Sequence, residues 1–138
     1  MSNAFTILIA DRNRHVREFL QRELRAEGYR VQVARDGREV LLMVKGDEPP
    51  DLLILDLEMP YGDGLTILEQ IRHHKPPLPI IIHSFLTDYA NHPDVADTAA
   101  FVEKSGNTDS LKAAVLEVLH SHYPTRFIQH EEDVLPGR

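Results

Sequence analysis

Five short runs of aliphatic and β-branched residues recur along the chain, and segments with helical spacing of apolar residues follow them. The runs lie at residues 5–10, 29–34, 51–56, 79–84 and 100–103. The third run is Leu-Leu-Ile-Leu between two aspartates, and its lack of apolar–polar alternation is typical of a parallel strand covered on both faces. Strict alternation of strands and helices predicts an open, doubly wound α/β fold with a five-stranded parallel sheet and helices on both faces.

The segments between these runs carry helix start and stop signals. Gly28 closes the first helical segment, as glycine often does at a helix C-terminus. Asp36 followed by Glu39 resembles a capping box at the start of the second. Pro93 interrupts residues 86–98, so we expect a short or distorted helix there. Thr108, or the residue before it, is expected to cap the last helix.

The length of 138 residues favours one domain, since domains average roughly 150 residues. Residues 123–138 contain Pro, Glu, Asp and Gly and no further helical pattern. We therefore expect one domain over residues 1–122 and a flexible C-terminal tail over residues 123–138.

The composition excludes several classes of protein. A net charge of −7 does not fit a nucleic-acid-binding domain, which usually has a basic face, so no direct nucleic-acid partner is expected. The absence of cysteine excludes disulfide frameworks, thiolate zinc sites and catalytic cysteines. There is no apolar run of about 18 residues and no signal-peptide pattern, so we expect a cytoplasmic protein without a membrane contact.

Polar residues follow or end four of the predicted strands. Asp11 ends the first, Asp56 the third, Ser84 the fourth and Lys104 the fifth. In open parallel sheets, ligands bind at the carboxyl ends of the strands, so these four side chains are expected to converge on one site. Two adjacent carboxylates need a cation between them, and a lysine and a hydroxyl suit anionic phosphoryl oxygens. The set predicts phosphoryl transfer onto a carboxylate, with Asp56 as the nucleophile.

At these positions the chain resembles the receiver domain of bacterial response regulators. The resemblance covers residues 5 to about 121 and rests on five motifs in the family's order: ILIAD (7–11), DLLILDLEMP (51–60), GDGL (62–65), PIIIHS (79–84) and AFVEKS (100–105). It implies a flavodoxin-like sheet with strand order 2-1-3-4-5.

The resemblance also implies a function in a two-component phosphorelay. A sensor histidine kinase or a phosphotransfer protein is expected to phosphorylate the domain, which then switches its contacts with a downstream protein effector. Dimerisation through the fourth and fifth elements is a further expectation. Such a domain is a signalling phosphoacceptor rather than an enzyme, and it assists only its own phosphorylation and dephosphorylation.

By resemblance, Asp56 is the phosphoacceptor. Lys104 matches the family's lysine, and Ser84 matches the hydroxyl that holds a phosphoryl oxygen. Phe101 matches the aromatic residue that changes rotamer when this hydroxyl engages the phosphoryl group, so Ser84 and Phe101 form the expected switch.

The expected cofactor is Mg²⁺, held by Asp11, by Asp56 and by the backbone carbonyl of Glu58. The chain departs from the family here, because the second of the two adjacent acids is replaced by Arg12. A guanidinium binds no cation. We therefore expect weakened Mg²⁺ binding, with Arg12 either pointing to solvent or paired with Asp56.

Phe85 is a second departure, since the residue after the hydroxyl position is usually small. Its ring is expected to narrow access to Asp56 and to shield an acyl phosphate from water. The eight histidines raise the question of a metal site. His83 lies in a predicted buried strand and is expected to be a core residue with its hydrogen bonds satisfied, and the other seven histidines show no metal-ligand pattern.

Two alternative functions remain open. The first is a pseudo-receiver that acts as a constitutive, phosphorylation-independent interaction module, with Arg12 occupying the cation site. The second is a phosphatase or hydrolase with an aspartyl nucleophile, in which Glu58 serves as the general acid close to Asp56.

Overall fold

The computed structural model describes residues 4–60 and 64–127, and in this part of the chain five strands alternate with helices. The strands are β1 (Thr6–Ala10), β2 (Arg30–Ala34), β3 (Leu52–Leu55), β4 (Ile80–Ser84) and β5 (Ala100–Glu103). The helices are α1 (Arg14–Ala26), α2 (Gly37–Val44), α3 (Gly64–Ile71), the 3-10 helix η1 (Thr87–Asn91), α4 (Pro93–Ala96) and α5 (Asp109–His122).

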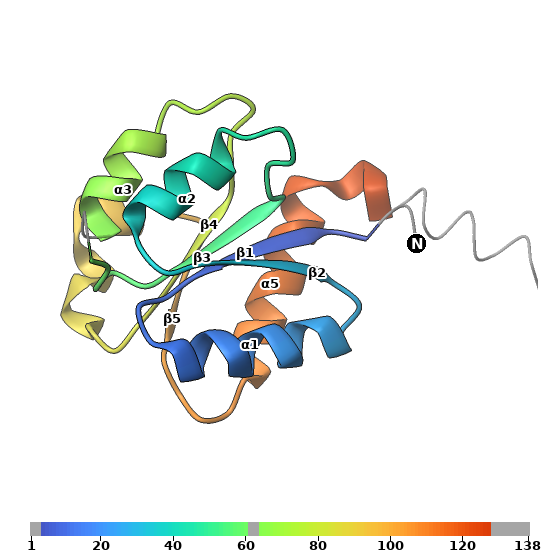
Figure 1. Ribbon diagram of the computed structural model, residues 1–138, viewed down its shortest axis with the longest axis horizontal. Helices are drawn as coiled ribbons and strands as arrows, with labels where there is room; N and C mark the ends of the chain where they lie inside the picture. Colours follow the sequence, from blue (N-terminus) through green and yellow to red (C-terminus); the bar gives the residue numbers. More distant parts are fainter. Residues whose placement is uncertain (1–3, 61–63, 128–138) are drawn as a thin grey trace, which may run out of the picture.

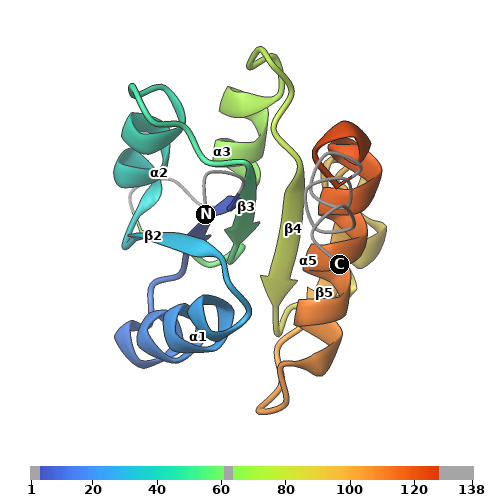
Figure 2. The same cartoon turned by 90° about the vertical axis from the view of Figure 1, so that its right-hand side faces the viewer.

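The five strands form one parallel sheet in the order β2-β1-β3-β4-β5. Figure 2 shows the neighbouring strands β3 and β4 of this sheet with their arrows pointing the same way. This order confirms the predicted doubly wound, flavodoxin-like fold. The strand order reverses next to β1, where the register pairs Ala10 of β1 with Leu55 of β3. The residues that follow these two strands therefore leave the sheet side by side.

Helices cover both faces of the sheet, with α1 and α5 on one face and α2 and α3 on the other (Figure 1). Strand side chains alternate between the two layers. Ile7 and Ile9 of β1 pack in the core beneath α1 and α5, whereas Leu8 and Ala10 pack in the core beneath α2 and α3. Each buried Leu or Ile stabilises the fold by about 1.5–3 kcal/mol relative to an exposed one, so both core layers hold the sheet in place.

Local signals explain where the helices begin and end. The side chain of Asn13 accepts a hydrogen bond from the backbone N–H of Val16 and caps α1. Gly28 follows α1 with φ of 97°, a conformation that residues with a Cβ rarely adopt. Asp36 caps α2 through the N–H of Glu39, as predicted.

The segment between β4 and β5 is short and irregular, as its proline predicts. The helix α4 spans only four residues, with Pro93 in its first turn and His92 as its N-cap. Proline is tolerated at this end of a helix because the N–H that it lacks has no partner within the helix. The fourth helix is therefore a single turn.

A cluster of contacts fixes the chain after α5 against the start of the sheet. The Tyr123 hydroxyl donates a hydrogen bond to the carbonyl of Asp51 at 2.7 Å, and Arg126 Nη1 lies 2.8 Å from an Asp51 carboxylate oxygen. The Phe127 and Phe5 rings stack with their centroids 5.4 Å apart. Among residues 4–60 and 64–127, no helix is long and apolar enough to cross a bilayer.

This cluster departs from the domain boundary expected at residue 122. The sequence after α5 is polar overall, which favoured a flexible tail, but two aromatic rings and an arginine find partners on the domain. Residues 123–127 therefore pack with the fold. The remainder of the expected tail, residues 128–138, lies outside the described residues.

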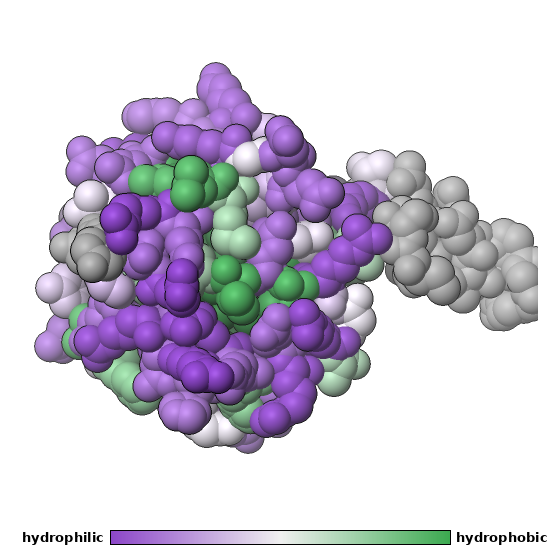
Figure 3. Space-filling view, in the orientation of Figure 1, coloured by the Kyte–Doolittle hydropathy of each residue, from purple (hydrophilic) through white to green (hydrophobic). Residues whose placement is uncertain are grey.

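Polar side chains cover most of the face viewed in Figure 1, and apolar side chains form small patches among them (Figure 3). The most exposed large apolar side chain among the described residues is Leu42 of α2, at 73%. Single exposed leucines are common on protein surfaces.

Candidate functional site

Three of the four predicted site residues follow strands directly and meet at the carboxyl end of the sheet. Asp11 follows β1 and Asp56 follows β3, and the N–H of Asp56 donates a 2.9 Å hydrogen bond to the carbonyl of Ala10. Lys104 follows β5, and its N–H donates to the carbonyl of Ser84 at 3.0 Å. The parallel register thus brings residues from distant parts of the sequence to one edge of the sheet.

The ammonium of Lys104 bridges the two carboxylates. Its Nζ lies 2.8 Å from Asp11 Oδ2 and 3.2 Å from Asp56 Oδ2. The three side chains are buried, with exposed fractions of 9%, 2% and 3% for Lys104, Asp11 and Asp56. Buried like charges repel strongly, so this ammonium supplies the positive charge that lets the carboxylates lie together.

Backbone groups hold the second oxygen of each carboxylate. Asp56 Oδ1 accepts a hydrogen bond from the N–H of Glu58 at 3.0 Å, and Asp11 Oδ1 accepts one from the N–H of Asn13 at 2.8 Å. Burial nevertheless raises the pKa of Asp56 above its ordinary value, and the nearby negative charge of Asp11 adds to the rise. The hydrogen bond from the Glu58 N–H and the positive charge of Lys104 lower this pKa, but burial outweighs them. Raised carboxyl pKa values are typical of functional sites.

A close backbone approach fixes the loop that follows Asp56. The N–H of Gly64, the first residue of α3, donates to the carbonyl of Leu57 at 2.9 Å. A Cβ on Gly64 would lie 2.6 Å from the Leu57 Cα, a separation that real Cβ atoms do not reach. The second glycine of the GDGL motif is therefore required for packing.

Ser84 and Phe101 lie on the same face of the sheet, on the neighbouring strands β4 and β5. Ser84 is fully buried, and its Oγ accepts a hydrogen bond from the N–H of Leu86 at 2.9 Å. Phe101 pairs with Ile82 in the register and packs, half-buried, against the core beneath α2 and α3. The two expected switch residues are thus two register positions apart on neighbouring strands, and no described contact joins Ser84 to Asp56.

Arg12 has a different partner from those that the sequence suggested. Its Nη2 lies 2.6 Å from Glu58 Oε2, and the two side chains are 60% and 37% exposed. The guanidinium is therefore neither paired with Asp56 nor left to solvent alone. It joins the loop after β1 to the loop after β3 at the edge of the site.

Phe85 directly follows β4 and lies beside Lys104 at the edge of the site. The ring is 69% exposed, and Lys104 Nζ lies 5.5 Å from its centroid. This geometry is a cation–π contact, which favours the ammonium in its observed position. The ring also lines an apolar groove of about 300 Å³, together with Val16, Phe19, Leu20 and His83.

The structure corrects the expectation for His83. The residue is buried in β4, but its Nδ1 has no hydrogen-bond partner among the described residues. Burial lowers its pKa to about 4, aided by the nearby charge of Lys104 and opposed by Asp11. Its hydrogen bonds are therefore not all satisfied. Sequence alone gave no sign of this, because the missing partner depends on which side chains of α1 and α5 face β4.

Comparison with known proteins identifies the family to which this fold belongs. The family model for the response regulator receiver domain matches residues 7–116. This chain belongs to that family. The receiver domain is similar to response regulator MprA of Mycolicibacterium vanbaalenii, with 45% identity over 55% of this chain. That match covers 32% of MprA, so the chain corresponds to about a third of this relative.

Solved structures match the receiver domain over most of its length. The response regulator TrrA of Thermotoga maritima, determined in complex with Mg²⁺-BeF, is 35% identical with a TM-score of 0.77, and the match covers 83% of this chain and 99% of TrrA. TrrA was also determined in complex with the histidine kinase ThkA, and this structure is 34% identical with a TM-score of 0.74, covering 83% of this chain and 98% of TrrA.

The carboxylates of the site are the kind of oxygen ligand that Mg²⁺ prefers. Among the described residues, no group of three or more His, Cys, Asp or Glu side chains is arranged to hold a metal. Asp11 and Asp56 nevertheless place two carboxylates together. Mg²⁺ in phosphoryl-transfer sites is usually held by one or two carboxylates, with waters and phosphate oxygens completing the shell.

Proposed function

We propose that this receiver domain accepts a phosphoryl group on Asp56 from a sensor histidine kinase or a phosphotransfer protein and then switches its protein contacts. The observation that carries the proposal is the ammonium of Lys104 between two buried carboxylates, 2.8 Å from Asp11 and 3.2 Å from Asp56. Preorganised positive charge of this kind stabilises the negative charge of a transferring phosphoryl group.

In the proposed reaction, a carboxylate oxygen of Asp56 attacks phosphorus and forms the acyl phosphate. The phosphorus–nitrogen bond of the donor phosphohistidine breaks, and the imidazole nitrogen keeps the electron pair and takes up a proton. Lys104 then faces phosphoryl oxygens. Ser84 Oγ accepts from Leu86 but retains its own proton, which it can donate to a phosphoryl oxygen. Movement of Ser84 opens space for Phe101, and this step is the proposed switch.

Asp11, Asp56 and the backbone carbonyl of Glu58 are the proposed Mg²⁺ ligands. When bound, Mg²⁺ neutralises charge on the phosphoryl oxygens. Arg12 stands next to Asp11 and pairs with Glu58, so it adds positive charge at the edge of the cation site. We propose that this charge weakens Mg²⁺ binding.

The Arg12→Asp variant tests that effect. It removes a positive charge and supplies a carboxylate, so we expect Mg²⁺ to bind about tenfold or more tightly, because Coulomb energies at these separations reach a few kcal/mol. Isothermal titration calorimetry measures the affinity. Arg14→Asp is the matched control, since Arg14 pairs with Glu18 on α1 and its change in charge is identical. Equal gains in both variants would contradict a local effect of Arg12.

Phosphoryl uptake is tested with acetyl phosphate and Mg²⁺, followed by intact mass measurement. We expect a gain of one phosphoryl group that depends on Mg²⁺ and is absent in Asp56→Ala. No gain under any condition would favour the pseudo-receiver. Sustained turnover of an aryl phosphate would favour the hydrolase, because a receiver releases its phosphoryl group slowly.

Phe85 is proposed to shield the acyl phosphate. Its ring lies at the rim beside Lys104, where it limits the approach of water, and water exclusion protects reactive intermediates. We expect Phe85→Ala to shorten the lifetime of phosphorylated protein by roughly threefold to tenfold. Intact mass followed over time measures the loss, with Leu42→Ala as an exposed apolar control on α2. An unchanged lifetime in Phe85→Ala would contradict shielding.

The proposed partners follow from this chemistry. A phosphohistidine-bearing kinase or phosphotransfer protein must reach Asp56 from the carboxyl edge of the sheet, in the cytoplasm. A protein effector, or a second copy of the domain, is proposed to contact the surface near Phe101 and α4 after phosphorylation. The catalysis is confined to the domain's own phosphorylation and dephosphorylation.

A further inference from the structure

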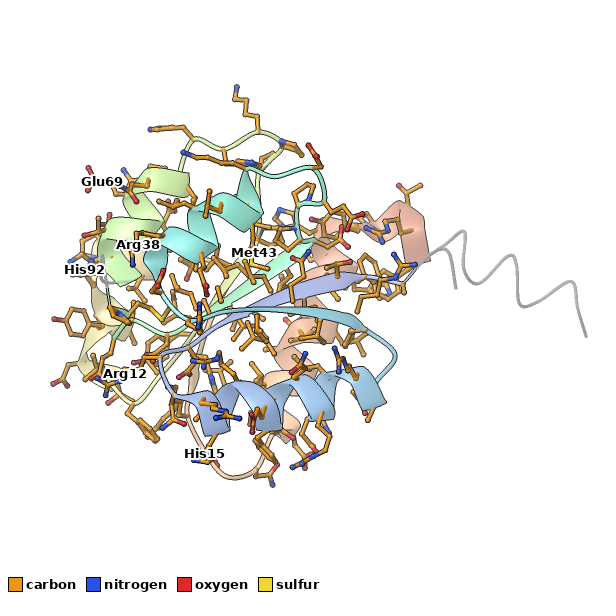
Figure 4. All side chains as sticks on the ribbon, viewed as in Figure 1. Arg12, His15, Arg38, Met43, Glu69 and His92 are labelled. Atoms are coloured by element: carbon orange, nitrogen blue, oxygen red, sulfur yellow. The ribbon has the colours of Figure 1, made fainter. Side chains whose placement is uncertain are left out.

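The ion pair between Arg12 and Glu58 flanks the phosphorylation site on both sides. Arg12 directly follows Asp11, and Glu58 lies two residues after Asp56 and donates its N–H to Asp56 Oδ1 at 3.0 Å. The 2.6 Å contact between their side chains therefore ties together the two loops that carry the site carboxylates. Figure 4 shows Arg12 at the carboxyl end of the sheet.

The two cations of the site are held very differently. Lys104 is 9% exposed and contacts both buried carboxylates, so its charge is already shared. Arg12 is 60% exposed, and its contact is with one half-exposed carboxylate. Exposed ion pairs contribute little free energy and exchange partners easily. Of these two cations, Arg12 is therefore the one that can change its partner at a small cost in free energy.

A phosphoryl group on Asp56 would be the stronger partner for this guanidinium. It brings close to two negative charges, whereas Glu58 carries one. A guanidinium also binds phosphoryl oxygens through two parallel hydrogen bonds, which an ammonium cannot do. Charge and geometry therefore both favour transfer of Arg12 from Glu58 to the phosphoryl group.

We propose that Arg12 is a phosphoryl-binding residue that exchanges Glu58 for the phosphoryl group when Asp56 is phosphorylated. The exchange rests on the proposed function and deepens it. It gives Arg12 part of the charge neutralisation at the site. It also releases the carboxylate of Glu58 and unties the loops after β1 and β3, which is a response separate from that of Ser84 and Phe101.

The exchange predicts that Glu58 competes with the phosphoryl group only while Arg12 is present. We expect Glu58→Gln to raise the rate of phosphorylation by acetyl phosphate, or the lifetime of the product, by about fivefold. At saturating Mg²⁺, where the effect of Arg12 on Mg²⁺ binding no longer matters, Arg12→Gln is expected to lower both quantities. In the double variant, Glu58→Gln should have no further effect. Glu18→Gln, which breaks the exposed Arg14–Glu18 pair of α1, is the matched control and should leave both quantities unchanged.

A second readout follows the side chains directly. Upon addition of beryllofluoride and Mg²⁺, a mimic of the phosphorylated carboxylate, nuclear magnetic resonance should show shifts of the Arg12 Nε–H signal and of the Glu58 carboxyl carbon. Arg12→Lys should retain only part of the effect on phosphorylation, because an ammonium lacks the paired donors.

Two results overturn the exchange. If Glu58→Gln changes phosphorylation by the same factor with and without Arg12, Glu58 acts through its charge alone. If the Arg12 signal does not move although phosphorylation occurs, Arg12 keeps its partner. Failure of every variant to take up phosphate would instead overturn the proposed function itself, and the exchange with it.

Discussion

Replacement of Lys104 by methionine is expected to lower the free energy of unfolding by about 3–5 kcal/mol, the usual cost of removing one partner from a buried ion pair. Two carboxylates that are 2% and 3% exposed would lose the ammonium between them. Methionine has an apolar side chain of similar length to the lysine stem. The loss in free energy of unfolding therefore measures the effect of removing the charge. Urea unfolding at pH 7 measures it, and phosphoryl uptake is expected to disappear in the same variant.

The control for Lys104 is Lys112→Met. Lys112 lies 2.9 Å from Glu23, and these side chains are 23% and 30% exposed, so water can replace the lost contact and the expected cost is far smaller than for Lys104. In a Lys104→Met background, Asp56→Asn should recover part of the lost stability, because it removes one of the two facing charges. A Lys104→Met variant no less stable than Lys112→Met would contradict the bridging role.

His83 is expected to make the fold sensitive to mild acid. Its pKa is about 4 in the folded domain, against 6.5 ordinarily, so between these values the unfolded chain binds a proton that the folded domain does not. Stability therefore falls as pH falls through this window. The full contribution is about 3 kcal/mol, lost between pH 6.5 and pH 4.

The comparison of wild type with His83→Leu isolates this contribution. Urea unfolding at a series of pH values from 7 to 4 should show a smaller loss of stability in the variant, since Lys104, Asp11 and the exposed His15 around the groove remain in both proteins. His73→Leu, at an exposed surface position, should leave the profile unchanged. Parallel profiles for wild type and His83→Leu would show that the histidine is not held neutral by burial.

The sheet and the carboxylate pair could be predicted because both depend on backbone geometry. Short apolar runs predict the five strands, and the parallel register determines which strand ends are neighbours. Asp11, Asp56 and Lys104 come directly after such strand ends, so their positions in the fold follow from the backbone. The single-turn α4 could be predicted for the same reason, since Pro93 restricts the backbone at that point.

The features that sequence reasoning missed depend on side chains meeting across elements. The partner of Arg12 is the side chain of Glu58 on another loop, and a long exposed guanidinium can reach several acceptors. Tyr123 and Phe127 stand in a polar segment, yet they pack on residues at the start of the sheet. Which partner such a side chain contacts depends on distances in the folded protein. The spacing of apolar residues along the sequence carries no information about these distances.

The proposed reaction makes Asp56 itself an acyl phosphate. After incubation with acetyl phosphate and Mg²⁺, reduction with borohydride converts a phosphorylated aspartate to homoserine, and peptide mass mapping locates the converted residue. We expect homoserine at position 56, and none there when the protein is first treated with hydroxylamine, which cleaves acyl phosphates. Conversion at another residue, or phosphate that resists hydroxylamine, would contradict it.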